Sequence, residues 1–256
     1  FFVLFFDLKY IKNKRKQAFI PVITVISVLS VMVGVMSLIV VLSVMNGFRD
    51  DLMSKILGVN SHVLVLNYGG AFKDYEKVGK KVEEVEDVLA STPFIYSQWM
   101  IKSSGNVSMA VVRGLDPRSV VNVLDIESMI KKGSLTSIGG SADGLPGIII
   151  GNELSRKVKA HPGDTLIVVS PEGESTPSGR VPKTKKYRVA AIFDSGMYDY
   201  DSSMAFISLK ESQDLLELGD RVTGLEIKVR DVYKADAVAQ AIQEKLSYPY
   251  WTRDWK

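Results

Sequence analysis

The stretch AFIPVITVISVLSVMVGVMSLIVVLSV, residues 18–44, decides the fold of this chain because it contains no charged residue. An α-helix of this length spans about 40 Å, more than the roughly 30 Å hydrocarbon core of a bilayer. A cleaved signal peptide has an apolar run of only about 7 to 15 residues. The sequence therefore predicts a retained transmembrane helix, which together with its outer extension covers residues 18–57.

The direction of this helix follows from the charges that flank it. Residues 1–17 hold five basic side chains and one acidic one, namely Lys9, Lys12, Lys14, Arg15, Lys16 and Asp7. Basic flanks stay in the cytoplasm, so the N-terminus is expected to be cytoplasmic and the chain beyond the helix extracytoplasmic. The apolar and polar residues of 1–17 alternate as in an amphipathic helix lying in the membrane interface, which predicts a cytoplasmic elbow.

Small residues gather on one side of the expected transmembrane helix. Ser30, Gly34 and Ser37 lie on this side and would let another helix approach closely. A partner helix in the same complex and a simple anchor surrounded by lipid are equally compatible with this pattern.

The chain after the helix alternates between strand and helix patterns. Residues 61–67 read as a strand, residues 74–89 as an amphipathic helix, and residues 95–101 and 107–115 as a hairpin around a Ser-Gly-Asn turn. The segment 147–158 reads as a buried strand that enters a helix. These patterns predict an α+β fold.

The second half is rich in strands and turns. Strands are expected at 165–170, 187–193, 205–208 and 222–229, and helices at 209–218 and 233–246. Ala237, Ala241 and Leu246 are the predicted buried positions of the last helix. Residues 171–186 contain three prolines and no apolar face, so they are expected to project from the fold. Two similar segments around a β-rich insert would return the chain's end to its start.

No arrangement of catalytic or metal-binding residues is predicted. The chain has no cysteine and two histidines, His62 and His161, neither at a metal-ligand spacing. Asp199 and Asp201 are more typical of a solvated turn than of an acid–base pair. No glycine-rich nucleotide motif is present, and no basic stripe suited to nucleic acid follows residue 17. The residues indicate a membrane-anchored binding or coupling domain, not an enzyme.

Five short motifs resemble one known family. They are LSVMNGF (42–48), VRGLDP (112–117), IIIGNELS (148–155), HPGDTLIVVSP (161–171) and SGMYDYD (195–201). In this order they resemble permease subunits of lipoprotein-releasing ABC transporters, the LolC/LolE family of Gram-negative bacteria. The resemblance implies a MacB-like periplasmic domain in the bacterial inner membrane.

The resemblance also implies a division of the periplasmic domain. A porter-like α+β part would cover residues 58–118 and return at 222–250, around a β-rich inserted part at 119–221. WTRDW (251–255) resembles the approach to a second transmembrane helix. The later transmembrane helices of the family are expected beyond residue 256, and so are the segments that contact its ATPase.

The family's carrier-recruiting subunit carries a hook at the place where this chain has TPSGRVP. The implied carrier-binding hook is Thr176, Pro177, Ser178, Gly179, Arg180, Val181 and Pro182. Proline stiffening would reduce the entropy lost on docking, and Arg180 would offer a fork of donors. From the residues alone, a disordered surface loop is the favoured interpretation of this segment.

The resemblance implies several partners. These are a second permease subunit or second copy, two cytoplasmic ATPase subunits that hold ATP and Mg, a periplasmic carrier, the lipoprotein cargo and membrane lipid. Val44, Met45 and Phe48 are the candidates for contact with the lipoprotein's acyl chains, with ordinary helix packing as the other interpretation.

Other functions stay open on the sequence alone. Within the same superfamily, the chain could be a macrolide-exporter-like or mechanotransmitting permease, which a trans-envelope adaptor partner would favour. A membrane-tethered enzyme or passive receptor belongs to another class and predicts a protein that ends near residue 256.

Overall fold

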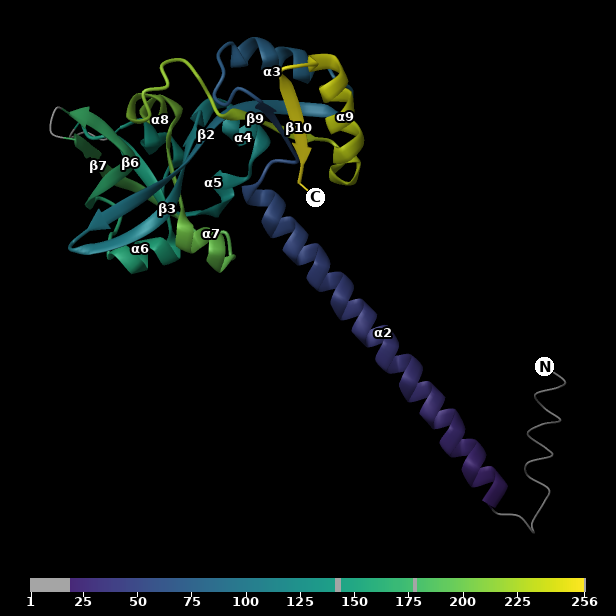
Figure 1. The fold of residues 1–256 in the computed structure, drawn as a ribbon. Helices are drawn as coiled ribbons and strands as arrows, with labels where there is room; N and C mark the ends of the chain where they lie inside the picture. Colours follow the sequence, from purple (N-terminus) through teal and green to yellow (C-terminus); the bar gives the residue numbers. More distant parts are fainter. Residues whose placement is uncertain (1–18, 141–143, 177–178, 256) are drawn as a thin grey trace. The chain divides into compact units, whose positions relative to one another are not determined.

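The computed structural model describes residues 19–140, 144–176 and 179–255 (Figure 1). The expected cytoplasmic elbow, residues 1–17, lies outside these ranges. Two compact units can be distinguished, residues 1–53 and residues 54–256, and each is treated by itself. The predicted finer boundaries at residues 118 and 221 stay predictions.

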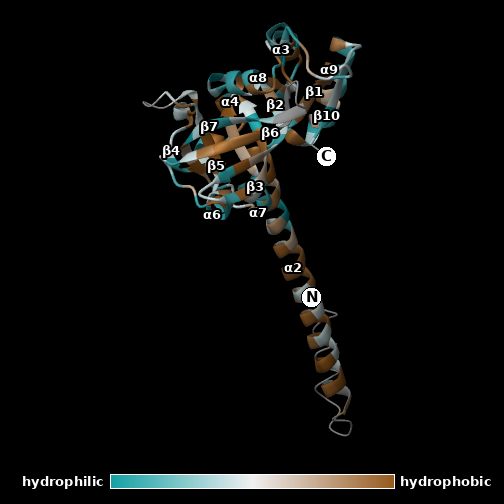
Figure 2. Cartoon of the chain, turned by 60° about the vertical axis from the view of Figure 1, so that its left-hand side comes forward, coloured by the Kyte–Doolittle hydropathy of each residue, from teal (hydrophilic) through white to brown (hydrophobic). Residues whose placement is uncertain are grey.

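The first unit consists, in its described part, of most of helix α2 (Phe19–Val59). Among the described residues, α2 is the one helix long and apolar enough to cross a membrane. Apolar colouring covers most of its length in Figure 2. The predicted helix is therefore confirmed over residues 19–57, and it continues two residues further, to Val59.

Ten strands form one sheet in the described part of the second unit. They are β1 (Val63–Asn67), β2 (Val88–Ser103), β3 (Asn106–Leu115), β4 (Ile130–Gly133), β5 (Gly147–Gly151), β6 (Thr165–Thr176), β7 (Gly179–Phe193), β8 (Met204–Ser208), β9 (Gly224–Val229) and β10 (Tyr250–Asp254). Their order is β10-β1-β9-β2-β3-β8-β5-β7-β4, and β6 pairs with both β2 and β7. The β3–β8 and β5–β7 pairs are parallel, and the others are antiparallel.

Short helices connect these strands. They are α3 (Tyr75–Glu83), α4 (Pro117–Val123), α5 (Ile126–Met129), the 3-10 helix η1 (Leu135–Gly139), α6 (Asn152–Val158), α7 (Tyr198–Ser203), α8 (Leu209–Leu215), the 3-10 helix η2 (Val232–Lys234) and α9 (Ala235–Leu246). The mixture of helices and strands confirms the predicted α+β class.

One apolar cluster lies at the β1–β9 end of this sheet, and another lies around its middle strands. At one end, residues of β1 and β9 pack with α3 and α9, including Val65, Val82, Ile227 and Ile242. Around the middle strands, Trp99 is fully buried. β10 pairs with β1 from Val63↔Asp254 to Asn67↔Tyr250. This pairing confirms the prediction that the end of the domain returns to its start.

Two sequence predictions of helices need correction. The helix expected over 74–89 ends at Glu83, because Asp87 has a φ of 68°, a left-handed conformation that a helix cannot continue through, and Val88 begins β2. In α9, Ala237 and Ala241 are exposed and Leu246 is half-buried. The buried residues are instead Ala235, Val238, Ala239 and Ile242, which follow the i, i+3, i+4, i+7 spacing of one helix face.

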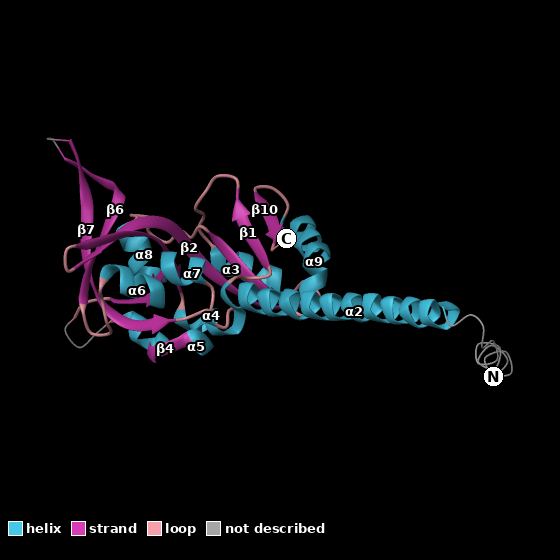
Figure 3. Cartoon of the chain, turned by 90° about the horizontal axis from the view of Figure 1, so that it is seen from below, coloured by secondary structure: helices cyan, strands magenta, loops and turns pink. Residues whose placement is uncertain are grey.

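The segment 171–186 belongs to a hairpin. β6 continues to Thr176 and β7 begins at Gly179, with the pairs Glu174↔Val181, Ser175↔Arg180 and Thr176↔Gly179 near its tip. Figure 3 shows β6 and β7 extending together beyond the rest of the domain. The segment therefore projects as expected, and paired strands make up most of it.

Tight packing at Gly151 offers a test of this fold. A Cβ at Gly151 would lie 2.2 Å from the backbone oxygen of Asp201, whereas a Cβ at Gly139 would meet nothing within 4 Å. We expect G151A to lower the free energy of unfolding by about 1–3 kcal/mol, as overpacking does. G139A should change it by less than about 0.5 kcal/mol. Denaturant unfolding of the detergent-solubilised chain, followed by tryptophan fluorescence, measures both, and equal losses would contradict the packing described here.

Candidate functional site

The last residues of α2 are embedded in the second unit. Val59 is 1% exposed and belongs to an apolar cluster with residues of α4, α5 and β8. The carbonyl of Gly58 accepts a hydrogen bond from the amide of Asp125, at 3.2 Å. The side-chain amide of Asn60 donates to the hydroxyl of Tyr200, at 2.6 Å. The end of the helix is thus held by both apolar packing and hydrogen bonds.

A buried arginine completes this attachment. Arg113 of β3 is 2% exposed, and its Nη1 donates to the carbonyl of Val59 at 3.0 Å. Its guanidinium also forms an ion pair with Glu226 of β9, which is 4% exposed. Carbonyls in the last turn of a helix have no partner within the helix. Arg113 therefore binds the end of α2 and joins it to two strands; this site is called the Arg113 clamp.

A cleft of about 560 Å³ adjoins the clamp. It is lined by Arg113 and Glu226, by apolar side chains that include Leu64, Leu66 and Phe94, and by further polar groups. Residues from both ends of the domain also line it, namely Ile56, Asn60, Asp254 and Trp255. The indole of Trp255 donates to the carbonyl of Val232 at 3.0 Å, which orders the last described residues beside the cleft.

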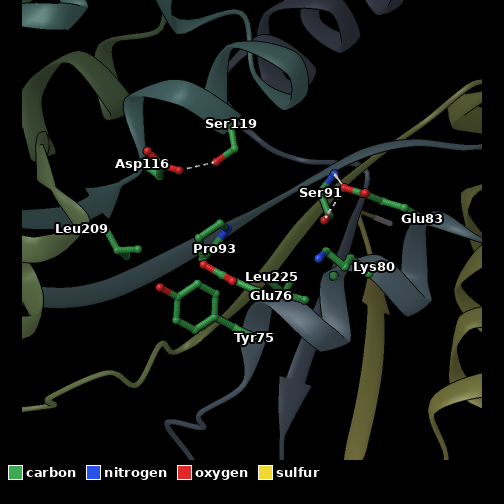
Figure 4. Close-up of a pocket in the computed structure, with 11 residues that line it drawn as sticks. Tyr75, Glu76, Lys80, Glu83, Ser91, Pro93, Asp116, Ser119, Leu209 and Leu225 are labelled. Atoms are coloured by element: carbon green, nitrogen blue, oxygen red, sulfur yellow. Dashed lines mark hydrogen bonds between the residues drawn. The ribbon is translucent and has the colours of Figure 1, made fainter.

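A second, more polar cavity of about 250 Å³ lies between α3, β2 and α4 (Figure 4). Two of its three carboxylates, those of Glu83 and Asp116, have hydrogen-bond partners in the fold. Glu83 accepts from the amide and hydroxyl of Ser91, at 3.0 and 2.8 Å, and Asp116 accepts from the hydroxyl of Ser119, at 3.1 Å. Asp116 also caps α4 by accepting from the amide of Arg118. These groups stabilise helix ends and strand edges, so the cavity does not resemble a reaction centre.

The predicted hook residues lie at the tip of the β6–β7 hairpin. Thr176 and Gly179 form the last described backbone pair, Arg180 and Val181 follow on β7, and Pro182 is exposed. Pro177 and Ser178 lie outside the described residues. The structure therefore brings the described members of the set together on one hairpin, and their role in binding a carrier stays a prediction.

Ion pairs attach the root of this hairpin to the domain. Lys183 lies 3.0 Å from the carboxylate of Glu217, and Lys185 pairs with Glu211 of α8. The hydroxyl of the buried Tyr187 lies 3.5 Å from the carboxylate of Glu211. These contacts fix where the hairpin leaves the domain.

The three predicted lipoprotein-contacting residues lie in the first unit. Val44, Met45 and Phe48 are exposed side chains of α2. Val44 and Phe48, four positions apart, lie on the same side of the helix, and Met45 lies next to them. Contact of these three side chains with acyl chains stays a prediction.

Of the remaining polar candidates, Asp201 has a structural role, and the expectation that it lies in a solvated turn is wrong for its side chain. Asp201 is 4% exposed, and its carboxylate accepts from the amide and hydroxyl of Ser195, each at 2.8 Å. Burial raises the pKa of Asp201 above its usual value. Asp199 is exposed, and His161 is exposed beside Asp164. Among the described residues, no group of three or more potential metal ligands is close enough to hold an ion.

The sequence pattern does not identify the Arg113 clamp as a site. Arg113 lies within the motif VRGLDP, but its partner Glu226 is more than a hundred positions away. The available signal was a single arginine among the apolar residues of MAVVRGL (109–115). A charged residue inside a buried strand needs a partner, and the pattern alone does not say which.

The fold and these sites define a class: an α+β domain attached directly to a long apolar helix, with a projecting hairpin. A family model for the MacB-like periplasmic core domain matches residues 24–245. The chain belongs to this family.

Curated relatives carry a more specific name. The chain is 30% identical over 252 residues to the lipoprotein-releasing system transmembrane protein LolC of Neisseria meningitidis serogroup B, covering 97% of this chain and 59% of the relative. It is 23% identical over 257 residues to the LolE protein of Haemophilus influenzae, covering 98% of this chain and 60% of the relative. The chain thus spans about three fifths of the length of these relatives.

A solved structure also aligns with most of the domain. The periplasmic region of MacB from Actinobacillus actinomycetemcomitans superposes with a TM-score of 0.49 at 11% identity, covering 78% of this chain and 90% of that chain.

His62 makes a pH-dependent contribution to stability that can be measured. Its Nδ1 lies 3.1 Å from both the amide nitrogen and the carbonyl oxygen of Val229, and burial lowers its pKa below 6.5. Below 6.5 the unfolded state therefore binds more protons than the folded state, so stability falls as the pH drops toward the lowered folded-state pKa.

We expect H62Q to remove this part of the acid destabilisation, while the exposed control H161Q keeps it. Unfolding midpoints measured from pH 7.5 downward compare the variants with the wild type. The same pH dependence in H62Q and the wild type would contradict the assignment.

Proposed function

We propose that this chain is part of a permease subunit of an ATP-driven ABC transporter that releases lipoproteins from the inner membrane. The observation that carries the proposal is the similarity to LolC over 97% of this chain. The subunit would extract a lipoprotein from the outer leaflet and transfer it to a periplasmic carrier. It would act as a transport subunit, with ATP hydrolysed in a separate subunit.

The orientation proposed for the chain rests on charge. The basic residues before α2 favour a cytoplasmic N-terminus, which would place the domain of residues 54–256 in the periplasm. Two cytoplasmic ATPase subunits, with ATP and Mg, and a second permease or second copy would complete the transporter. Val44, Met45 and Phe48 are our candidates for contact with the acyl chains.

The energetics of lipid extraction support the need for such partners. Each buried CH₂ group contributes about 0.8 kcal/mol to membrane anchoring, so a triacylated protein is held by tens of kcal/mol in total. A single binding surface cannot supply this free energy. ATP hydrolysis and an apolar receiver for the released lipoprotein are therefore both expected.

The β6–β7 hairpin is the proposed docking site for the carrier. A paired hairpin loses less conformational entropy on binding than an unstructured loop of the same length. Its root is attached to the domain through Lys183 and Lys185. Arg180, next to the tip, would bind backbone carbonyls or carboxylates of the carrier.

A mechanotransmitting permease of the same superfamily is the second candidate. The feature that favours it is the attachment of the end of α2 to the domain through Arg113, Gly58 and Asn60. A transporter of that kind would pass movement to a different periplasmic partner and would not capture a lipoprotein carrier.

Site-specific photocrosslinking in intact cells separates these functions. A photoreactive residue at Ser178 or Arg180 is expected to capture the periplasmic carrier. The same residue at Ser104, the exposed tip of the β2–β3 hairpin, is the matched control and should capture none.

R180E should reduce carrier capture by about tenfold or more, the effect expected for loss of a charged anchor at an interface, while ATP hydrolysis continues. Absence of a carrier adduct at both hook positions, in a well-expressed protein, would favour the mechanotransmitting alternative.

A further inference from the structure

We infer that Arg113 is a positioning residue that couples movement of α2 to the periplasmic domain during transport. The inference rests on the proposed function and adds to it the contact through which ATP-driven movement reaches the domain. The observation behind it is a single buried guanidinium that binds both a helix end and a strand. This contact is separate from the hairpin and from the predicted acyl-chain contacts.

The surroundings of Arg113 make a merely packing role unfavourable. Its neighbours Val112 and Leu115 are buried, and Arg113 is 2% exposed. Moving a guanidinium and a carboxylate out of water costs free energy, and apolar residues of similar volume often fill such sites with equal or greater stability. The ion pair is therefore not needed merely to fill this space, and its specific contribution is the directional bond to the carbonyl of Val59.

The strands that meet at the clamp are paired, directly or through neighbouring strands, with the β6–β7 hairpin and with β10. Arg113 lies opposite Tyr96 of β2 and Phe206 of β8. β2 also pairs with β6, which runs into the projecting hairpin. Glu226 lies opposite Leu64 of β1, which pairs with β10. A displacement of Val59 would therefore reach the hairpin through β3, β2 and β6, and the end of the domain through β9, β1 and β10.

Other contacts at the same place keep the helix end folded when the clamp is removed. Val59 packs in its apolar cluster, Gly58 binds the amide of Asp125, and Asn60 binds Tyr200. Neither of the two hydrogen bonds joins the helix end to β3 or β9, although the apolar cluster also includes Leu115 of β3. A variant without the clamp should therefore fold but transmit movement poorly.

The test compares full-length transporters reconstituted with their ATPase subunits, the carrier and a labelled lipoprotein. R113M/E226L replaces the ion pair with apolar side chains. We expect the rate of ATP hydrolysis to stay within about twofold of the wild type. Lipoprotein release per ATP should be at least about tenfold lower, a size that is usual for the loss of coupling between two sites. The control K245A/E84A removes an ion pair between α9 and the residue that follows α3, and should change neither quantity.

Hydrogen exchange gives a readout that separates positioning from stability. The peptide covering residues 54–60 should exchange at least about tenfold faster in R113M/E226L, while the strands of the sheet keep wild-type protection. R113K keeps a donor for Val59 and should recover part of the release. R113E/E226R keeps opposite charges but puts an acceptor opposite the Val59 carbonyl, and should stay uncoupled. If R113M/E226L does not assemble into a transporter, R113K and R113E/E226R still test the role of Arg113.

Wild-type release per ATP in R113M/E226L, or full recovery in R113E/E226R, would overturn the inference and leave the proposed function intact. Failure of the wild-type transporter to release any lipoprotein would instead reject the proposed function.

Discussion

The rest of this structure depends on one requirement. The transmembrane helix ends inside a folded domain, and its last carbonyl groups need hydrogen-bond partners there. The last carbonyl groups of such a helix have no partner within the helix, and in a buried site an unpaired carbonyl is costly. Here Gly58 binds the amide of Asp125, and Val59 binds Arg113. The guanidinium needs a counter-charge in turn, which Glu226 supplies from β9. Helix α2, strand β3 and strand β9 are thereby joined at one buried point.

The strands next to this point bring the two ends of the domain together. β9 pairs with β1, which follows α2, and β1 pairs with β10 at the end of the described chain. Both ends therefore line one cleft. The β6–β7 hairpin is attached elsewhere, through β2 and the ion pairs at its root. One domain thus joins the end of α2 to a projecting hairpin.

Local patterns accounted for much of this fold in advance. The uncharged run predicted α2, and the turn at Ser104 and Gly105 predicted the β2–β3 hairpin. Local sequence patterns do not predict features that depend on contacts between residues far apart in the chain. Which face of α9 is buried depends on its contacts with β1 and β10, and these strands lie outside the helix's own sequence pattern. Arg113 was visible in the sequence, but its pairing with Glu226 exists only after the sheet has formed.

The central claim is that this chain serves lipoprotein release, and depletion of the protein in living cells tests it most directly. After depletion, membranes are separated and the lipoproteins in the inner and outer membranes are measured. The account predicts that lipoproteins destined for the outer membrane accumulate in the inner membrane within a few generations, while other exported proteins are sorted as before. Unchanged sorting of lipoproteins after complete depletion would contradict it.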